Sequence, residues 1–304
     1  MNILIITQLK SFWHRLRFVI WFLPRFLFKR DFIILRKINI YGPIETLRFI
    51  SDNRVSVSRF GDGEFALLSG NDTQFQSYNP VIAKKLRDIL LSNQLGHIVC
   101  IPHPWRDFKH LKFRAIEYWG AYLNRALRTQ VLPFIKIDKQ YYDSYFTRFY
   151  IDWQADKIAR ETIPLLKSIW DGRDICIVEG EHTKMGVGND LFNNVKSISR
   201  ILCPSRNAFD VYDSILYRAL LLPKTTLVLV SLGMTATCLA YDLSINGFQA
   251  IDAGHMDIEY EWFRMKATNK VSIKGKDIAE VNQELSFVAD DPKYQSEVIA
   301  VVSH

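Results

Sequence analysis

Glycine, proline and cysteine are all scarce in this sequence, at 14, 10 and 4 of its 304 residues. So little glycine and proline excludes a collagen-like or low-complexity disordered chain. The four cysteines lie far apart and form no CxxC pair, which excludes a small domain held together by disulfides. We expect them to be buried free thiols in a reducing cytoplasm. The length and the 48% hydrophobic content fit one large globular domain with a substantial core.

The sequence also lacks a long uncharged run near its start. The longest runs there are residues 1–9 and 18–24, whereas a membrane-spanning helix needs roughly 20 apolar residues. Basic residues recur through the first 31 residues and no small-residue cleavage site follows, so a secretory signal is not expected either. These residues hold six Lys or Arg against one Asp and account for most of the net charge of +7. The body is therefore nearly neutral, which argues against a nucleic-acid partner.

Residues 1–35 form an amphipathic and basic segment. Apolar side chains recur there at helical spacing with cations between them: Phe12, Trp13, Leu16, Val19, Ile20 and Leu23. A helix of this kind lies in a membrane interface, with its rings among the acyl chains and its cations on anionic head groups. We therefore expect a protein that is peripheral on the inner, cytoplasmic face of the cytoplasmic membrane. A helix that caps the core, with solvated cations, is the alternative. Residues 36–304 are expected to form a single domain.

Strand and helix patterns alternate through this domain. Short, nearly continuous β-branched runs predict strands at residues 55–59, 97–101, 175–179, 199–202, 226–231 and 249–252. Helical patterns with start or stop signals are found at about 80–92, 205–222 and 235–246. The alternation predicts an α/β, Rossmann-like domain whose mainly parallel sheet has helices on both faces. Residues 104–170 are aromatic-rich and the tail after about 267 is polar, and neither is placed by its pattern.

Ligands of such sheets bind beyond the carboxyl ends of the strands, and four of the expected strand ends carry unusual loops. Asp62 and Glu64, separated by one glycine, follow the first strand and offer oxygen ligands to Mn²⁺ or Mg²⁺. An ordinary Asp-Gly turn is the alternative. A glycine turn at 232–235 leads into a helix, whose N-terminus is a natural anion site but also an ordinary connection.

The other two loops are longer. GEHTKMGVGND at 180–190 could cradle a phosphate through its backbone N–H groups, or be a surface loop without a ligand. AGHMDIEYEW at 253–262 holds one histidine and three acids within seven residues. A general base or a further metal ligand could come from it, although a lone histidine in a loop is more often a surface residue.

Several blocks resemble, in the same order, those of the GT-D-fold glycosyltransferases, bacterial enzymes with an Asp-X-Glu metal motif. The blocks are SVSRFGDGEFALLSG at 56–70, SYFTRFY at 144–150, VEGEHTKMGVGNDLF at 178–192, ILCPSRNAF at 201–209, SLGMTATCLAYDL at 231–243 and AGHMDIEYEW at 253–262. The resemblance covers about residues 40–266. It departs from the family at Met234, where proline is expected in many relatives and would stiffen the turn.

The resemblance implies roles for individual residues. Asp62 and Glu64 would hold Mn²⁺ or Mg²⁺ on the diphosphate of a nucleotide-sugar. The catalytic residues would be His255, Asp257 and Glu261, near the reacting sugar. The residues that bind the donor would be Arg59, Gly61, Gly186, Gly188, Asn189, Asp190, Gly233 and Thr235.

These observations favour a metal-dependent hexosyltransferase that moves a sugar from a UDP-sugar such as UDP-glucose to a growing bacterial surface glycan, lipid-linked or protein-linked. Sugar transfer develops negative charge on the leaving diphosphate, which a divalent metal and helix N-termini stabilise. A metal-dependent phosphoesterase would use the same carboxylates. A non-catalytic, membrane-associated scaffold of a glycan assembly complex would bind neither metal nor UDP.

Overall fold

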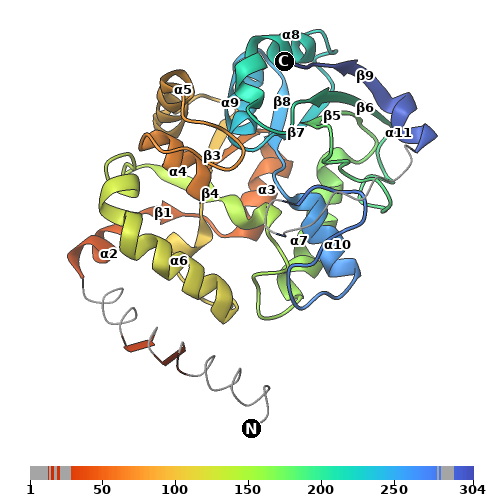
Figure 1. The fold of residues 1–304 in the computed structure, drawn as a ribbon. Coiled ribbons are helices and arrows are strands. Elements are labelled where there is room, and N and C mark those ends of the chain that lie inside the picture. The colour runs from red at the N-terminus through yellow and green to blue at the C-terminus, as the bar shows by residue number, and fades with distance from the viewer. Residues whose placement is uncertain (1–12, 14, 17–18, 21–28, 279–280, 282–290) are drawn as a thin grey trace.

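The computed structural model describes residues 13, 15–16, 19–20, 29–278, 281 and 291–304. In these residues nine strands form one sheet, in the order β1-β4-β3-β2-β8-β7-β5-β6-β9, and every neighbouring pair is parallel (Figure 1). The strands are β1 Asn39–Ile40, β2 Ser56–Arg59, β3 His97–Ile101, β4 Gln140–Asp143, β5 Asp174–Gly180, β6 Ser197–Cys203, β7 Leu227–Ser231, β8 Gln249–Asp252 and β9 Val298–Val301. The expected α/β fold is confirmed, and every predicted strand is present.

Helices cover both faces of this sheet (Figure 1). The described helices are α2 Arg30–Leu35, α3 Pro43–Asn53, α4 Asp62–Leu68, α5 Pro80–Leu91, α6 Phe113–Ala126, α7 Lys157–Trp170, α8 Tyr212–Leu220, α9 Met234–Ile245, α10 Met256–Arg264 and α11 Pro292–Glu297. Leu227 and Leu229 of β7 share a core with α3, α7 and α10, whereas Val228 and Val230 share one with α4, α5, α8 and α9. Because both faces are buried, the strands read as continuous apolar runs.

Local signals set most of the helix boundaries. The Asn79 side chain accepts a hydrogen bond from the Val81 amide at 2.8 Å, and Pro80 starts α5, as the cap pattern predicts. The helix expected from about residue 205 begins later, because a 3₁₀ turn, η4 (Ala208–Val211), precedes α8. The four cysteines are buried and unpaired, as expected.

The two segments that the sequence pattern leaves unplaced are part of the folded body. The first contains η1 (His103–Trp105), α6, a π-helical turn η2 (Leu127–Val131), β4 and η3 (Ser144–Thr147). From the polar tail, α11 and β9 extend the sheet beyond β6. Strands β1 and β4 escape detection because they contain few β-branched residues, whereas β9 has the β-branched sequence VIAV and was missed because it lies at the end of the polar tail.

Part of the N-terminal segment belongs to the body as well. Phe32 and Leu35 of α2 are buried in the core, so the domain begins before residue 36, where its start was expected. Most of residues 1–28 lie outside the described residues, and the predicted amphipathic helix lies there. Of the described ones, Trp13 and Ile20 are exposed, and the Arg15 guanidinium lies 5.3 Å from the centre of the Phe113 ring. In the part of the chain that the structure describes, no helix is long and apolar enough to cross a membrane.

A buried arginine joins the tail to the sheet. Arg200 of β6 forms ion pairs with Glu179 of β5 at 2.6 Å and with Glu297 of α11 at 2.7 Å. Its guanidinium also lies 4.7 Å from the centre of the Tyr294 ring. The side chains of Arg200 and Glu179 are 2% and 0% exposed, so water contributes almost nothing to balancing their charges.

Replacement of Arg200 by methionine should lower the free energy of unfolding by about 3–5 kcal/mol, because it leaves a buried carboxylate without its partner. The matched control is Lys196→Met, which breaks the exposed Lys196–Asp174 pair of 3.0 Å and should cost below about 1 kcal/mol. Urea unfolding measures both. Equal losses for the two variants would show that Arg200 does not hold the tail in this way.

Candidate functional site

The carboxyl ends of the strands surround a cavity of about 680 Å³. Arg59, Gly180, Ser231 and Asp252, each at the end of a strand, form part of its wall. This is the place where a parallel sheet binds its ligands. The predicted residues that line the cavity are Arg59, Gly61, Asp62, Glu64, Gly233, His255 and Asp257; those that lie outside its lining are Gly186, Gly188, Asn189, Asp190, Thr235 and Glu261.

Asp62 and Glu64 occupy the first turn of α4 and not a strand-end turn. Glu64 folds back, and its Oε2 atom accepts a hydrogen bond from the Gly61 amide at 2.6 Å. Asp62 is more open to solvent and accepts a hydrogen bond from the Tyr118 hydroxyl. Burial, together with the nearby Asp252, raises the pKa of Glu64 to about 7.

The chemistry of these carboxylates fits a divalent cation. Among the described residues no three acidic, histidine or cysteine side chains converge as a complete metal cluster. Asp62 and Glu64 could thus supply only part of a coordination shell, and phosphate oxygens and water would supply the rest, which is the way in which Mg²⁺ is often bound. A cation would also relieve the repulsion between Glu64 and Asp252, which contributes to the raised pKa of Glu64.

Arg59 is fixed at the end of β2. Its Nε atom lies 3.4 Å from Asp252 Oδ1, and its Nη1 atom donates to the Thr147 hydroxyl. Gly254 has a φ of +46°, and a Cβ atom at this position would lie 2.2 Å from Arg59 Nη2. Only glycine therefore lets the chain after β8 pass so close to the guanidinium.

The glycine turn before α9 also faces the cavity. Gly233 lines it with a φ of +52°, whereas Thr235 is buried in the first turn of the helix. Met234 reaches over the acidic motif, since its Sδ atom lies 3.0 Å from the place of a Cβ atom on Gly63. The side chain that stands where proline was expected therefore packs against the glycine between the two carboxylates.

Three groups were expected to be catalytic, and the structure places them differently. His255 lines the cavity, and burial with the nearby Arg148 and Arg59 lowers its pKa to about 3, so the ring is neutral at neutral pH. Asp257 lines the cavity too, but its carboxylate accepts hydrogen bonds from the Gly186 amide at 3.0 Å and from Asn189 at 2.7 Å. Of the three, His255 has the geometry that best fits a group facing a substrate.

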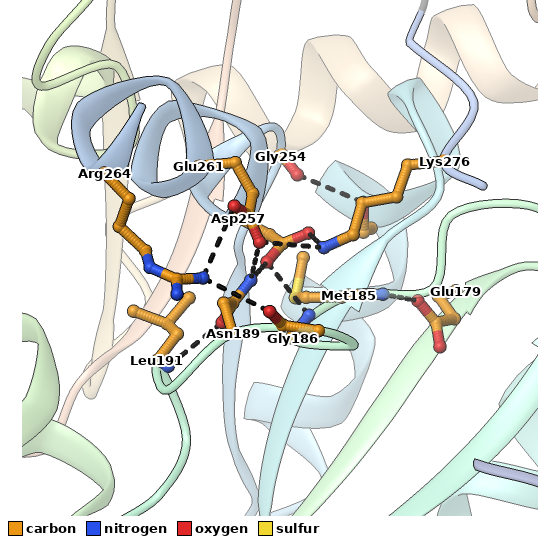
Figure 2. A network of polar contacts seen from close by, with 12 residues as sticks. Glu179, Met185, Gly186, Asn189, Leu191, Gly254, Asp257, Glu261, Arg264 and Lys276 are labelled. Atoms are coloured by element: carbon orange, nitrogen blue, oxygen red, sulfur yellow. Dashed lines mark hydrogen bonds and ion pairs between the residues drawn. The ribbon is translucent and has the colours of Figure 1, made fainter. Parts of the chain in front are cut away.

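The expected donor loop faces the cavity with its first half only. Gly180, Thr183 and Met185 line the cavity, whereas residues 186–190 do not and contact α10 instead. Figure 2 shows Gly186 and Asn189 beside Asp257 and Glu261 of this helix. Glu261 binds Asn189 at 2.7 Å, and Asp190 accepts a hydrogen bond from the Tyr260 hydroxyl at 2.9 Å. The contacts of residues 186–190 thus hold the loop, and this differs from the direct donor contact that the resemblance implies.

The chain can now be compared with known proteins. A family model described as "Glycosyltransferase GT-D fold" matches residues 57–281. The chain belongs to the GT-D-fold glycosyltransferase family. The resemblance noted in the sequence is thereby confirmed.

Two curated relatives come from streptococci. Glycosyltransferase GlyD of Streptococcus pneumoniae serotype 4 is 36% identical over 266 residues, and the probable glycosyl transferase Gly of Streptococcus gordonii is 33% identical over 270 residues. These matches cover 86% and 87% of this chain but 32% and 39% of those proteins. The chain thus spans between about a third and two fifths of the length of the curated relatives it matches.

Solved structures are similar over most of the chain. One, described as "The highly conserved domain of unknown function 1792 has a distinct glycosyltransferase fold", has a TM-score of 0.83 and 36% identity over 89% of this chain and 99% of that one. Another, described as a new glycosyltransferase from Streptococcus sanguinis, has a TM-score of 0.83 and 33% identity over 87% and 99%.

The GT-D-fold site also contains residues that the sequence reasoning missed. Arg114, Tyr118, Arg148, Asp152 and Lys270 also line the cavity. Burial and the nearby Arg148 lower the pKa of Lys270 to about 8. Only Arg148 lies within a block of family resemblance, 144–150, and that block is the one signal that could have pointed to it. The others belong to segments that the sequence pattern could not place.

The carboxylate of Glu259 is the ion-pair partner of Arg148 and should make the free energy of unfolding depend on pH. Its Oε2 atom accepts hydrogen bonds from the Tyr150 and Ile151 amides at 2.9 Å, and Oε1 lies 4.0 Å from Arg148 Nη1. Burial, together with Asp152, raises the pKa of Glu259 to about 7. A raised pKa in the folded state means that folding favours the protonated form. The stabilisation of the folded state by protonated Glu259 is therefore complete below pH 4.5 and is lost as the pH rises through 7.

Glu259→Gln keeps an acceptor for the two amides but cannot titrate. The free energy of unfolding of this variant should therefore fall less between pH 4.5 and 7.5 than that of the wild type. One titrating group changes the free energy of unfolding by at most about 1.4 kcal/mol per pH unit. Denaturant unfolding across this range measures the slopes, with the surface variant Glu161→Gln as control. A slope unchanged by Glu259→Gln would assign the pH dependence to other groups.

Proposed function

We propose that this GT-D-fold enzyme transfers a hexose from a UDP-sugar such as UDP-glucose, with Mn²⁺ or Mg²⁺ held by Asp62 and Glu64. The observation that carries the proposal is that this carboxylate pair lies in one cavity with the cations Arg59, Arg148 and Lys270. A nucleotide diphosphate suits both groups, because its oxygens bind to the cations directly and to the carboxylates through a divalent ion.

The residues of the chain would stabilise the leaving diphosphate. The cationic side chains of Arg148 and Lys270 would donate charge-assisted hydrogen bonds to the phosphate oxygens. Gly233 and Met234 begin α9 at the cavity, where the positive end of the helix dipole would favour an anion. A bound divalent ion would supply Lewis-acid stabilisation of the same charge.

The acceptor would enter beside His255. Its neutral ring has a nitrogen that can accept a hydrogen bond from an acceptor hydroxyl, and it stands at the cavity free of the contacts that engage Asp257. Asp257 and Glu261 would act as groups that position the loop behind it.

The acceptor that we propose is a growing bacterial surface glycan or glycoconjugate, lipid-linked or protein-linked. We further propose that the basic N-terminal segment holds the enzyme on the anionic inner face of the cytoplasmic membrane. The exposed Trp13, Val19 and Ile20 are suitable side chains for such an interface. Two other hypotheses, a metal-dependent phosphoesterase and a non-catalytic scaffold of a glycan assembly complex, make different predictions in the experiments below.

Asp62→Asn should remove Mn²⁺-dependent binding of UDP-glucose while the fold persists. In the wild type, ligand at about 100 times its Kd raises stability by about 2.7 kcal/mol, which a thermal shift detects readily. Asp88→Asn, on the exposed surface of α5, is the matched control. Sugar transfer that is unchanged in EDTA would contradict the metal site. Release of phosphate or nucleotide without any sugar acceptor would favour the phosphoesterase, and absence of UDP binding would favour the scaffold.

Deletion of residues 1–28 should release the protein from vesicles that contain anionic lipid. It leaves α2 and its buried Phe32 and Leu35 in place, so binding of UDP-glucose should persist. Binding of the full chain should weaken as salt rises, because screening shortens the reach of its cations. Co-sedimentation measures both effects. If the deletion does not change co-sedimentation, the segment does not anchor the protein to the membrane, and the alternative of a helix that caps the core is favoured.

A further inference from the structure

A buried lysine from the polar tail reaches the wall of the site. Lys276 is 4% exposed, and its Nζ atom lies 2.5 Å from Asp257 Oδ2 and 3.9 Å from Glu261 Oε1 (Figure 2). The neighbouring Lys274 is exposed, as is usual for a lysine in a polar segment. Burial of an ammonium group is costly unless a carboxylate compensates its charge. The position of Lys276 therefore indicates a specific role for its contact with Asp257.

Asp257 connects this lysine to the loop of residues 181–190. Its Oδ1 atom accepts hydrogen bonds from the Gly186 amide at 3.0 Å and from Asn189 Nδ2 at 2.7 Å (Figure 2). Asn189 Nδ2 also donates to Glu261 at 2.7 Å. One carboxylate thus joins the tail, α10 and the loop.

The same loop presents its first half to the cavity. Met185 is held from both sides, because its amide donates to Glu179 at 2.7 Å and its carbonyl accepts from Arg200 at 3.0 Å. The next residue, Gly186, has a φ of +76°, and a Cβ atom there would lie 2.4 Å from the Phe192 ring. The loop therefore has little freedom at Gly186, whose amide Asp257 holds directly after Met185 and three residues after Thr183.

We propose that Lys276 is a positioning residue of the donor site: it compensates the charge of Asp257, which can then hold residues 181–190 in the conformation that presents Thr183 and Met185 to the nucleotide-sugar. Without Lys276, the buried carboxylate would keep only neutral donors and would turn toward water or take up a proton. Either change weakens its hold on Gly186 and Asn189. The tail makes a second contact with this loop, since the Asp277 amide donates a hydrogen bond to the His182 carbonyl at 2.9 Å.

The identity of the ligand rests on the proposed function, but the contact between tail and loop does not. The first measurement is therefore amide hydrogen exchange in the absence of ligand. Lys276→Met should speed exchange in residues 181–190, and Lys274→Met, which removes an exposed lysine two residues away, should leave it unchanged. Unchanged exchange in the loop of Lys276→Met would overturn the proposal, whatever the enzyme binds.

The second measurement separates positioning from a general loss of structure. With UDP-glucose and Mn²⁺, Lys276→Met should raise the KM for the donor about 10- to 100-fold, the usual effect of removing a partner that orients a binding group, with a smaller change in kcat. Lys276→Arg keeps the charge and should restore most of the affinity. A fall in kcat at unchanged KM would contradict the donor-side role.

A double-mutant comparison tests the pair itself. In an Asp257→Asn background the carboxylate that Lys276 is proposed to compensate is gone, and only the more distant Glu261 remains beside the lysine, so the change of Lys276 to methionine should alter the donor KM less than about twofold. This double variant leaves no carboxylate at position 257 without a partner, and Glu261 keeps its contact with Arg264, so the variant should fold even if Lys276→Met alone does not. An equal effect of the lysine replacement in both backgrounds would mean that Lys276 acts through packing alone, and would refute the proposal. If the wild type binds no UDP-glucose, the proposed function fails, and hydrogen exchange still decides the role of Lys276.

Discussion

The parallel pairing of all strands in the described sheet is the constraint on which the rest of the molecule depends. It places every carboxyl end at one edge and sends the connecting helices to the two faces. The strands become buried on both sides, and their continuous apolar runs follow from that. The loops that follow the strands at this edge lie outside the sheet and do not take part in strand pairing. They are therefore free to surround a cavity, and the loops after β2, β5, β7 and β8 do so.

The same geometry gathers charge in a small, partly buried volume. Burial raises the pKa of Glu64 to about 7 and, with the neighbouring arginines, lowers that of His255 to about 3. Fixed partners hold each group in place, such as the Gly61 amide on Glu64 and Asp252 on Arg59. Groups held in this way need no reorganisation when charge develops on a substrate, which is the property that the proposed transfer from a diphosphate donor would require.

Segments distant in the sequence complete this site. The Tyr118 hydroxyl from α6 reaches Asp62, and Lys276 from the tail reaches Asp257. Arg200 joins β5 and β6 to α11 in the same manner. The strand-end loops therefore depend on the outer elements for their conformation, so a description of the motif residues alone omits the groups that orient them.

The sequence by itself determined the fold class, the central strands, several helix starts, the acidic motif and the family, because apolar periodicity, caps and short motifs are encoded by neighbouring residues. Only the tertiary structure decided which motif residues face the cavity. Asp257 turns to the Gly186 amide, 71 positions away, and Glu261 to Asn189, 72 positions away. The short strands β1 and β4 and the buried Lys276 were equally hidden. Each is defined by contacts between distant parts of the chain, and no local pattern records which distant group a side chain will meet.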